Sequence, residues 1–137
     1  MNTNNGDINM SDQPSVLIVE DSPPQALKTK LALESNGCQV TWADTGLGGL
    51  DMARQKNFDL IVLDIELPDI NGFEVCKNLK ADSNLGDIPV IMLTTLDHAD
   101  DAMNGLNAGA IDYIPKDAFA DIVLVETIKQ MKVEVEQ

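Results

Sequence analysis

Residues 58–74, FDLIVLDIELPDINGFE, decide the fold that this chain is expected to adopt. The apolar run Leu60–Leu63 leads directly into Asp64, and Glu66 follows two positions later. A short continuous apolar run is typical of a strand that is buried on both faces, as in a parallel sheet. The stretch therefore predicts a central strand that ends on a carboxylate.

Similar apolar runs recur along the whole chain, with helical patterns between them. The predicted strands cover residues 16–19, 40–43, 60–63, 90–93 and 111–114. The predicted helices start at Pro23, Gly46, Asn71 or Gly72, Ala99 and Phe119. A strand followed by a helix, five times over, predicts an α/β fold with a doubly wound five-stranded parallel sheet and helices on both faces. The usual strand order at this size is 2-1-3-4-5, the flavodoxin-like arrangement.

The ends of the first predicted helix carry specific signals. Ser22 is a suitable N-cap, and Pro23 follows at a position where its missing N–H costs nothing. Asn36-Gly37 is a suitable left-handed end for the same helix. We expect Leu27 and Leu31 to form its core-facing stripe, and Leu47 to be available to the core from the second helix.

Length and composition favour one domain. The chain has 137 residues, of which 44% are hydrophobic, which suits a single packed core. We expect a flexible polar tail over 1–14, the domain over 15–132, and a tail or helix extension over 133–137. The polar start does not resemble a signal peptide, and no apolar run is long enough to span a membrane, so we expect a cytoplasmic protein.

The charge of the chain limits its partners. The formal net charge is −14, which disfavours direct binding to nucleic acid or to an anionic membrane surface. Cys38 and Cys76 form no CxxC pair and are expected to be buried thiols in a reducing compartment.

Polar and charged residues gather where the predicted strands end. Glu20-Asp21 follow the first strand, Asp64 the third, Thr94 ends the fourth, and Lys116 follows the fifth. In the expected strand order these positions share one edge of the sheet. Crowded carboxylates repel one another, and a bound Mg²⁺ would relieve that repulsion.

The chemistry that suits this group is phosphoryl transfer. We expect Asp21 and Asp64 to bind Mg²⁺ directly and Glu20 to act through water, and Mn²⁺ can replace Mg²⁺. Thr94 can donate to an oxyanion, and Lys116 can neutralise one. Asp64 is then the nucleophile, forming an aspartyl phosphate. We expect Thr95 to have no direct role.

Four segments together resemble the receiver domain of two-component response regulators, in particular the single-domain, chemotaxis (CheY-like) type. They are VLIVEDS (16–22), LIVLDIELPDINGFE (60–74), VIMLTT (90–95) and GAIDYIPK (109–116). The resemblance covers residues 15 to about 132. It implies a signalling domain that catalyses only its own phosphorylation and dephosphorylation.

The resemblance also assigns roles to individual residues. Asp64 matches the phosphoacceptor, and Lys116 matches the lysine that contacts the phosphoryl group. The matching metal ligands are Glu20, Asp21, Asp64 and the backbone carbonyl of Glu66. Thr94 and Tyr113 match the hydroxyl and the aromatic ring that move together in the switch. The donor is expected to be a histidine kinase or a phosphotransfer protein.

The chain departs from the family after Lys116. Family members usually have a proline there, often with a cis bond, whereas this chain has Asp117. A cis bond before a non-proline residue costs about 3 kcal/mol, so we expect either a trans loop or local strain. We also expect that Asp117 can pair with Lys116 and compete with a phosphoryl group.

The expected output surface is formed by the fourth helix, the fifth strand and the fifth helix. The fifth helix carries more apolar residues than one core-facing stripe needs. The fourth contains Asn104, Gly105 and Asn107, which are poor helix formers. We expect this face to contact a downstream protein or a second copy of the chain.

The sequence leaves three alternative functions open. A haloacid dehalogenase-type phosphohydrolase also uses an acid-x-acid pair, but its nucleophile normally follows the first strand. A toprim-like domain handles nucleic acid, which the net charge disfavours. A flavodoxin-like cofactor binder would need a phosphate-binding loop in place of Glu20-Asp21-Ser22.

Overall fold

The computed structural model of the chain describes residues 13–95 and 99–136, with the side chains of 94, 99–102 and 132–136 left aside. The tail expected over 1–14 lies almost wholly outside the described residues. None of the described helices is long and apolar enough to cross a membrane.

Five parallel strands form one sheet in the order β2-β1-β3-β4-β5, which confirms the predicted fold class. The strands are β1 (Ser15–Val19), β2 (Gln39–Ala43), β3 (Leu60–Leu63), β4 (Val90–Thr94) and β5 (Asp112–Pro115). All four residues of β3 are buried, as expected for a central strand covered on both faces.

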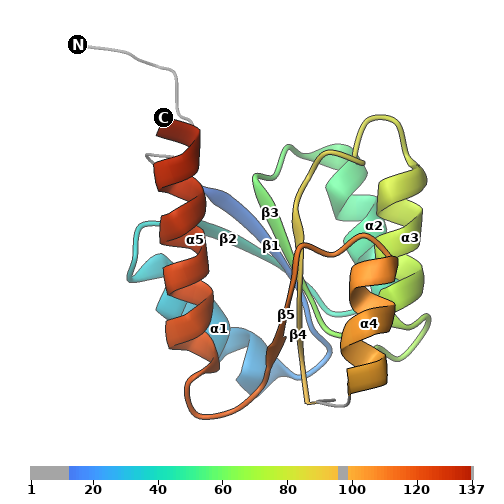
Figure 1. Ribbon diagram of the computed structural model, residues 1–137, viewed down its shortest axis with the longest axis horizontal. Coiled ribbons are helices and arrows are strands. Elements are labelled where there is room, and N and C mark those ends of the chain that lie inside the picture. The colour runs from blue at the N-terminus through green and yellow to red at the C-terminus, as the bar shows by residue number, and fades with distance from the viewer. Residues whose placement is uncertain (1–12, 96–98, 137) are drawn as a thin grey trace.

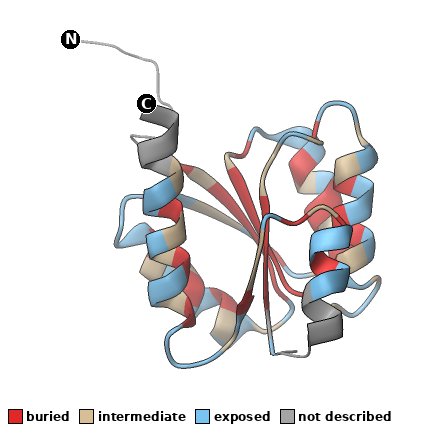
Figure 2. Ribbon diagram, in the orientation of Figure 1, coloured by how far each residue is buried: buried red, intermediate tan, exposed pale blue. Residues whose placement is uncertain are grey.

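Helices cover both faces of the sheet (Figure 1). They are α1 (Pro23–Glu34), α2 (Gly46–Gln55), α3 (Gly72–Ala81), α4 (Ala99–Asn107) and α5 (Ala120–Glu136). Helices α1 and α5 lie on one face, and α2, α3 and α4 lie on the other. Each face has its own apolar cluster, so the buried residues concentrate in the strands and on the inner sides of the helices (Figure 2).

The predicted end signals of α1 are present in the structure. The Ser22 side chain accepts a hydrogen bond from the Gln25 backbone N–H at 3.4 Å, and Pro23 is the first helical residue. Gly37 has a φ of +89°, a left-handed conformation that glycine adopts without a steric penalty. Local sequence thus determines where this helix begins and ends.

The predicted core-facing stripe of α1 was wrong. Leu27 and Leu31 are 55% and 53% exposed, and the helix buries Ala26, Thr29 and Leu33 instead. The exposed pair Leu27 and Leu31 and the buried set that begins at Ala26 both have helical spacing. Periodicity alone therefore could not decide which of the two sets faces the sheet. Leu47 of α2 is also exposed, while Leu50 of the same helix is buried.

The carboxyl ends of the strands meet at one edge, where the sheet pairing continues beyond the strands. The Glu20 backbone N–H donates to the Ala43 carbonyl at 3.0 Å, and the Asp64 N–H donates to the Val19 carbonyl at 3.0 Å. These bonds bring the segment after β1 between the ends of β2 and β3. The fold therefore places Glu20 and Asp64 side by side.

Candidate functional site

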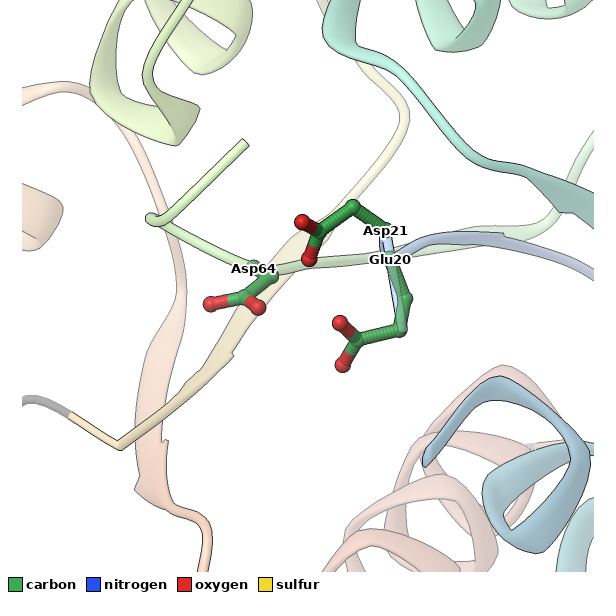
Figure 3. A group of neighbouring side chains, drawn as sticks. All are labelled: Glu20, Asp21 and Asp64. Carbon is green, nitrogen blue, oxygen red and sulfur yellow. The ribbon is translucent and has the colours of Figure 1, made fainter. Parts of the chain in front are cut away.

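Three carboxylates form an acidic group at the carboxyl edge of the sheet. Glu20 and Asp21 follow β1, and Asp64 follows β3 (Figure 3). One carboxylate oxygen from each lies within 4.8 Å of the others. Glu20 and Asp64 are 5% and 6% exposed, while Asp21 is exposed. The structure thus brings together the acids that were expected to meet from their positions at the strand ends.

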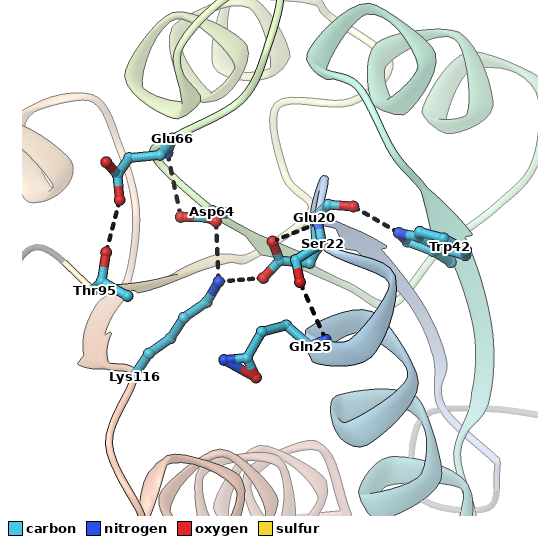
Figure 4. Close-up of polar contacts among 8 residues, drawn as sticks. All are labelled: Glu20, Ser22, Gln25, Trp42, Asp64, Glu66, Thr95 and Lys116. Atoms are coloured by element: carbon cyan, nitrogen blue, oxygen red, sulfur yellow. Dashed lines mark hydrogen bonds and ion pairs between the residues drawn. The ribbon is translucent and has the colours of Figure 1, made fainter.

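Lys116 reaches this group from the segment after β5. Its Nζ donates to Asp64 Oδ2 at 3.0 Å and also pairs with Glu20 Oε1 (Figure 4). The Lys116 side chain is only 9% exposed. One buried ammonium therefore bridges the two buried carboxylates. The expected contact of Lys116 with a phosphoryl group stays a prediction.

Burial and charge shift the ionisation of both partners. Burial raises the pKa of the Glu20 carboxyl, and repulsion from Asp64 adds to that effect against the opposing hydrogen bond from Lys116. Burial alone would lower the pKa of Lys116, but its bonds to Glu20 and Asp64 outweigh burial and hold that pKa above the ordinary lysine value. Two carboxylates share one ammonium, so an excess of negative charge remains.

That excess makes the acidic group suitable for a divalent cation. Its donors are carboxylate oxygens, the ligand type that Mg²⁺ and Mn²⁺ prefer. Asp21 is the exposed member, so a cation can approach from the solvent side. The residues present therefore fit the expected metal.

Glu66 and Thr95 form a contact on the far side of Asp64 from Glu20. The Glu66 backbone N–H donates to Asp64 Oδ1 at 3.2 Å, and the Thr95 hydroxyl donates to Glu66 Oε1 at 2.6 Å (Figure 4). Thr95 had been assigned no role from the sequence. Its contact with Glu66 joins the segment after β3 to the segment after β4.

Thr94 and Tyr113 lie where the resemblance expects them along the backbone. Thr94 is the last residue of β4 and is paired with Pro115 of β5, while its side chain is outside the described part. Tyr113 is paired with Met92 across the same two strands and packs, half-buried, against the core on the α3 and α4 face. The switch roles of both residues stay predictions.

Asp117 does not pair with Lys116 in the described structure. Its carboxylate accepts a hydrogen bond from the Phe119 backbone N–H at 2.8 Å, at the start of α5. No peptide bond in the described residues is cis, which agrees with the trans alternative. The expected competition of Asp117 for Lys116 is therefore not seen.

Trp42 is a neighbour of the acidic group that sequence reasoning missed. Its indole Nε1 donates to the backbone carbonyl of Glu20 at 2.7 Å (Figure 4). Trp42 is at the end of β2, which lies beside β1. A large polar-tipped aromatic at a strand end that adjoins the site was the available signal.

Substitution Lys116→Met is expected to lower the free energy of unfolding at neutral pH by roughly 3 kcal/mol, because it leaves two buried carboxylates without their cation. Lysine with a raised pKa stays charged at that pH, so its ion pairs contribute fully there and are lost only as the pH rises through the raised value. Added Mg²⁺ should restore part of the loss. Urea denaturation with and without Mg²⁺ measures both effects.

Lys28→Met is the matched control. Lys28 pairs with Asp121 at 3.5 Å, but its side chain is 56% exposed, so its loss should cost less than about 1 kcal/mol. Equal losses in the two variants would contradict the bridging role of Lys116.

Comparison with known proteins finds the same kind of domain by family model and by sequence similarity. The family model described as the response regulator receiver domain matches residues 16–129. Protein PilH of Pseudomonas aeruginosa is 41% identical over 101 residues, which cover 74% of this chain and 84% of PilH. The DNA-binding dual master transcriptional regulator RpaA of Synechocystis is 41% identical over 103 residues, covering 75% of this chain and 43% of RpaA.

Solved structures agree with the observed fold. A signal receiver domain of a histidine kinase from Syntrophus aciditrophicus has a TM-score of 0.81 at 35% identity, covering 90% of this chain and 93% of that one. A CheY-like receiver domain protein from Methanospirillum hungatei has a TM-score of 0.82 at 32% identity, and the match covers 91% of this chain and 98% of that one. The chain spans half or less of several curated relatives, including RpaA and the transcriptional regulator CseB of Streptomyces coelicolor.

Proposed function

The chain belongs to the response regulator receiver family, and on that basis we propose that Asp64 accepts a phosphoryl group from a histidine kinase or a phosphotransfer protein. Receivers of this family are phosphorylation-activated signalling switches. The observation that best supports Asp64 as the acceptor is the Lys116 bridge, which places a buried cation 3.0 Å from the Asp64 carboxylate.

In the proposed reaction an Asp64 carboxylate oxygen attacks phosphorus. The new O–P bond forms as the bond from phosphorus to the donor breaks, and the donor leaves with that electron pair. Glu66 N–H and Lys116 hold the two Asp64 oxygens and so orient the nucleophile. Lys116 remains protonated because its pKa is raised, and it can neutralise a phosphoryl oxygen. The Thr94 hydroxyl would donate a hydrogen bond to a second phosphoryl oxygen.

We assign cation binding to the carboxylates of Glu20, Asp21 and Asp64 and to the backbone carbonyl of Glu66. Support comes from the oxygen donors within 4.8 Å of one another and from the excess negative charge left by a single lysine. When bound, Mg²⁺ supplies positive charge to oxygens on which negative charge develops during transfer.

The proposed output surface is built from α4, β5 and α5. Large apolar side chains on or next to these elements are exposed: Met103, Leu106, Ile111, Phe119, Ile122 and Val123. We propose that a downstream protein or a second copy of the chain contacts part of this surface once Thr94 and Tyr113 have rearranged. Exposed apolar groups of this kind support a binding surface.

Helix α4 is proposed to be the element that responds, since Gly105 weakens it at a buried position. A Cβ at Gly105 would meet Met92, Tyr113 and Phe73 side chains at 3.4–3.6 Å, an ordinary packing distance. Substitution Gly105→Ala should therefore fit and raise the free energy of unfolding by about 0.5–1 kcal/mol. Urea denaturation measures the change.

Gly37→Ala provides the control for Gly105→Ala. Nothing lies within 4 Å of a Cβ at Gly37, but its φ is +89°, so the substitution should destabilise by about 1 kcal/mol through backbone strain alone. Destabilisation by Gly105→Ala would mean that α4 is not weakened by its glycine.

Intact mass after incubation with acetyl phosphate tests the proposed function. We expect one phosphoryl adduct that requires Mg²⁺ and that is stable in acid and labile in base, as an acyl phosphate is. Absence of an adduct both with acetyl phosphate and with a phosphorylated phosphotransfer protein would overturn the proposal. Continuous hydrolysis of a phosphate ester would instead favour a phosphohydrolase.

A further inference from the structure

Trp42 makes a contact that the phosphoryl-transfer chemistry does not use. Its indole N–H donates to the Glu20 carbonyl at 2.7 Å, although the side chain as a whole is 37% exposed (Figure 4). The ring therefore lies at the molecular surface while its only polar atom is bonded to the segment that carries the acidic pair.

The Glu20 carbonyl belongs to the peptide unit that joins Glu20 to Asp21. A peptide unit is planar and includes the Cα atoms on both sides. A bond to its oxygen therefore restrains the direction in which both acidic side chains leave the backbone. Any rotation of this plane would move the Glu20 and Asp21 carboxylates relative to Asp64.

A second hydrogen bond completes the restraint of Glu20. Its backbone N–H donates to the carbonyl of Ala43, the residue after Trp42, at 3.0 Å. The end of β2 thus holds Glu20 through both its N–H and its C=O. Among the described residues β2 is an edge strand that pairs with β1 alone, so the indole bond adds a restraint at the edge of the sheet.

Asp21 is the acid that benefits most from this restraint. It is exposed, whereas Glu20 and Asp64 are buried and bridged by Lys116. The position of the Asp21 carboxylate therefore depends mainly on its backbone. Without the indole bond, a bound cation would have to order that backbone at the cost of part of its binding free energy.

We infer that Trp42 is a positioning residue for divalent-cation binding, acting through the peptide unit between Glu20 and Asp21. The inference rests on the proposed function, because it assumes that the acidic group binds Mg²⁺. It assigns to Trp42 an effect on Mg²⁺ affinity, beyond any contribution of its ring to stability.

The test compares Mg²⁺ affinity in the wild type and in Trp42→Phe by titration calorimetry. Loss of the single hydrogen bond should raise the Mg²⁺ dissociation constant roughly three- to tenfold. The defect in phosphorylation by acetyl phosphate should be largest at limiting Mg²⁺ and should shrink as Mg²⁺ saturates. Leu47→Ala, at an exposed position on the neighbouring α2, is the control and should bind Mg²⁺ as the wild type does.

The chain contains one tryptophan, which allows a sharper version of the test. Biosynthetic replacement by a benzothienyl-alanine exchanges the indole N–H for sulfur while keeping the shape of the ring, and a fluorotryptophan keeps the N–H. We expect weaker Mg²⁺ binding only for the benzothienyl form. The fluorescence of Trp42 should also change during Mg²⁺ titration of the wild type, and Asp21→Asn should remove that change.

The outcomes separate this inference from the proposed function. If the wild type binds Mg²⁺ and the Phe and benzothienyl forms bind it equally well, Trp42 has only a structural role and the inference is wrong. If the wild type neither binds Mg²⁺ nor forms the phosphoryl adduct, the proposed function fails, and the inference fails with it.

Discussion

Asp64→Asn is expected to abolish the phosphoryl adduct formed with acetyl phosphate and Mg²⁺. The amide carries no negative charge and is a poor nucleophile, so the step that forms the O–P bond is lost. The fold should survive, because the substitution removes the excess negative charge that Glu20 and Asp64 share over one lysine. Intact mass gives the adduct, and urea denaturation gives the stability.

Asp51→Asn is the control for this loss. Asp51 is an exposed acid on α2, where its carboxylate contacts Gln55 at 3.3 Å, and its variant should form the adduct as the wild type does. An unchanged adduct in Asp64→Asn would assign the acceptor to another residue. Loss of the fold in Asp64→Asn would contradict the expectation that removing the shared negative charge leaves the structure intact.

Gly72→Ala is expected to lower the stability of the fold about as much as Lys116→Met does. A Cβ at Gly72 would lie 2.2 Å from the Asp64 carbonyl oxygen and 2.8 Å from the Ile65 Cα, both of them backbone atoms. Neither atom can move without displacing the end of β3, which carries the acceptor. We expect the free energy of unfolding to fall by about 3 kcal/mol, at the upper end for overpacking, and phosphorylation of Asp64 to slow.

Urea denaturation and the rate of adduct formation measure these two effects, with Gly105→Ala as the control for adding a methyl group to a buried helical glycine. Gly105 has ordinary packing distances where Gly72 has a clash. A loss of less than about 1 kcal/mol with normal phosphorylation would show that the segment between Asp64 and Gly72 can shift without moving the acceptor.

Sequence alone predicted a parallel sheet covered by helices on both faces, the order of its strands, and the edge of the sheet at which the site lies. Continuous apolar runs identify buried parallel strands, and residues that follow such runs must share one edge of the sheet. Glu20, Asp21, Asp64 and Lys116 were therefore placed together without coordinates, and the structure agrees. The cap at Ser22 was equally predictable, because capping depends on a few neighbouring residues.

Tertiary structure alone decided which side chains contact one another. Lys116 and Glu20 are 96 positions apart, Thr95 and Glu66 are 29 apart, and Trp42 and Glu20 are 22 apart. Such contacts depend on strand register and rotamers, which local patterns do not specify. The same limit explains α1, where two stripes have helical spacing and only packing against the sheet buries Ala26 and Leu33 rather than Leu27. Periodicity determines which residues share a face, and packing determines which face is buried.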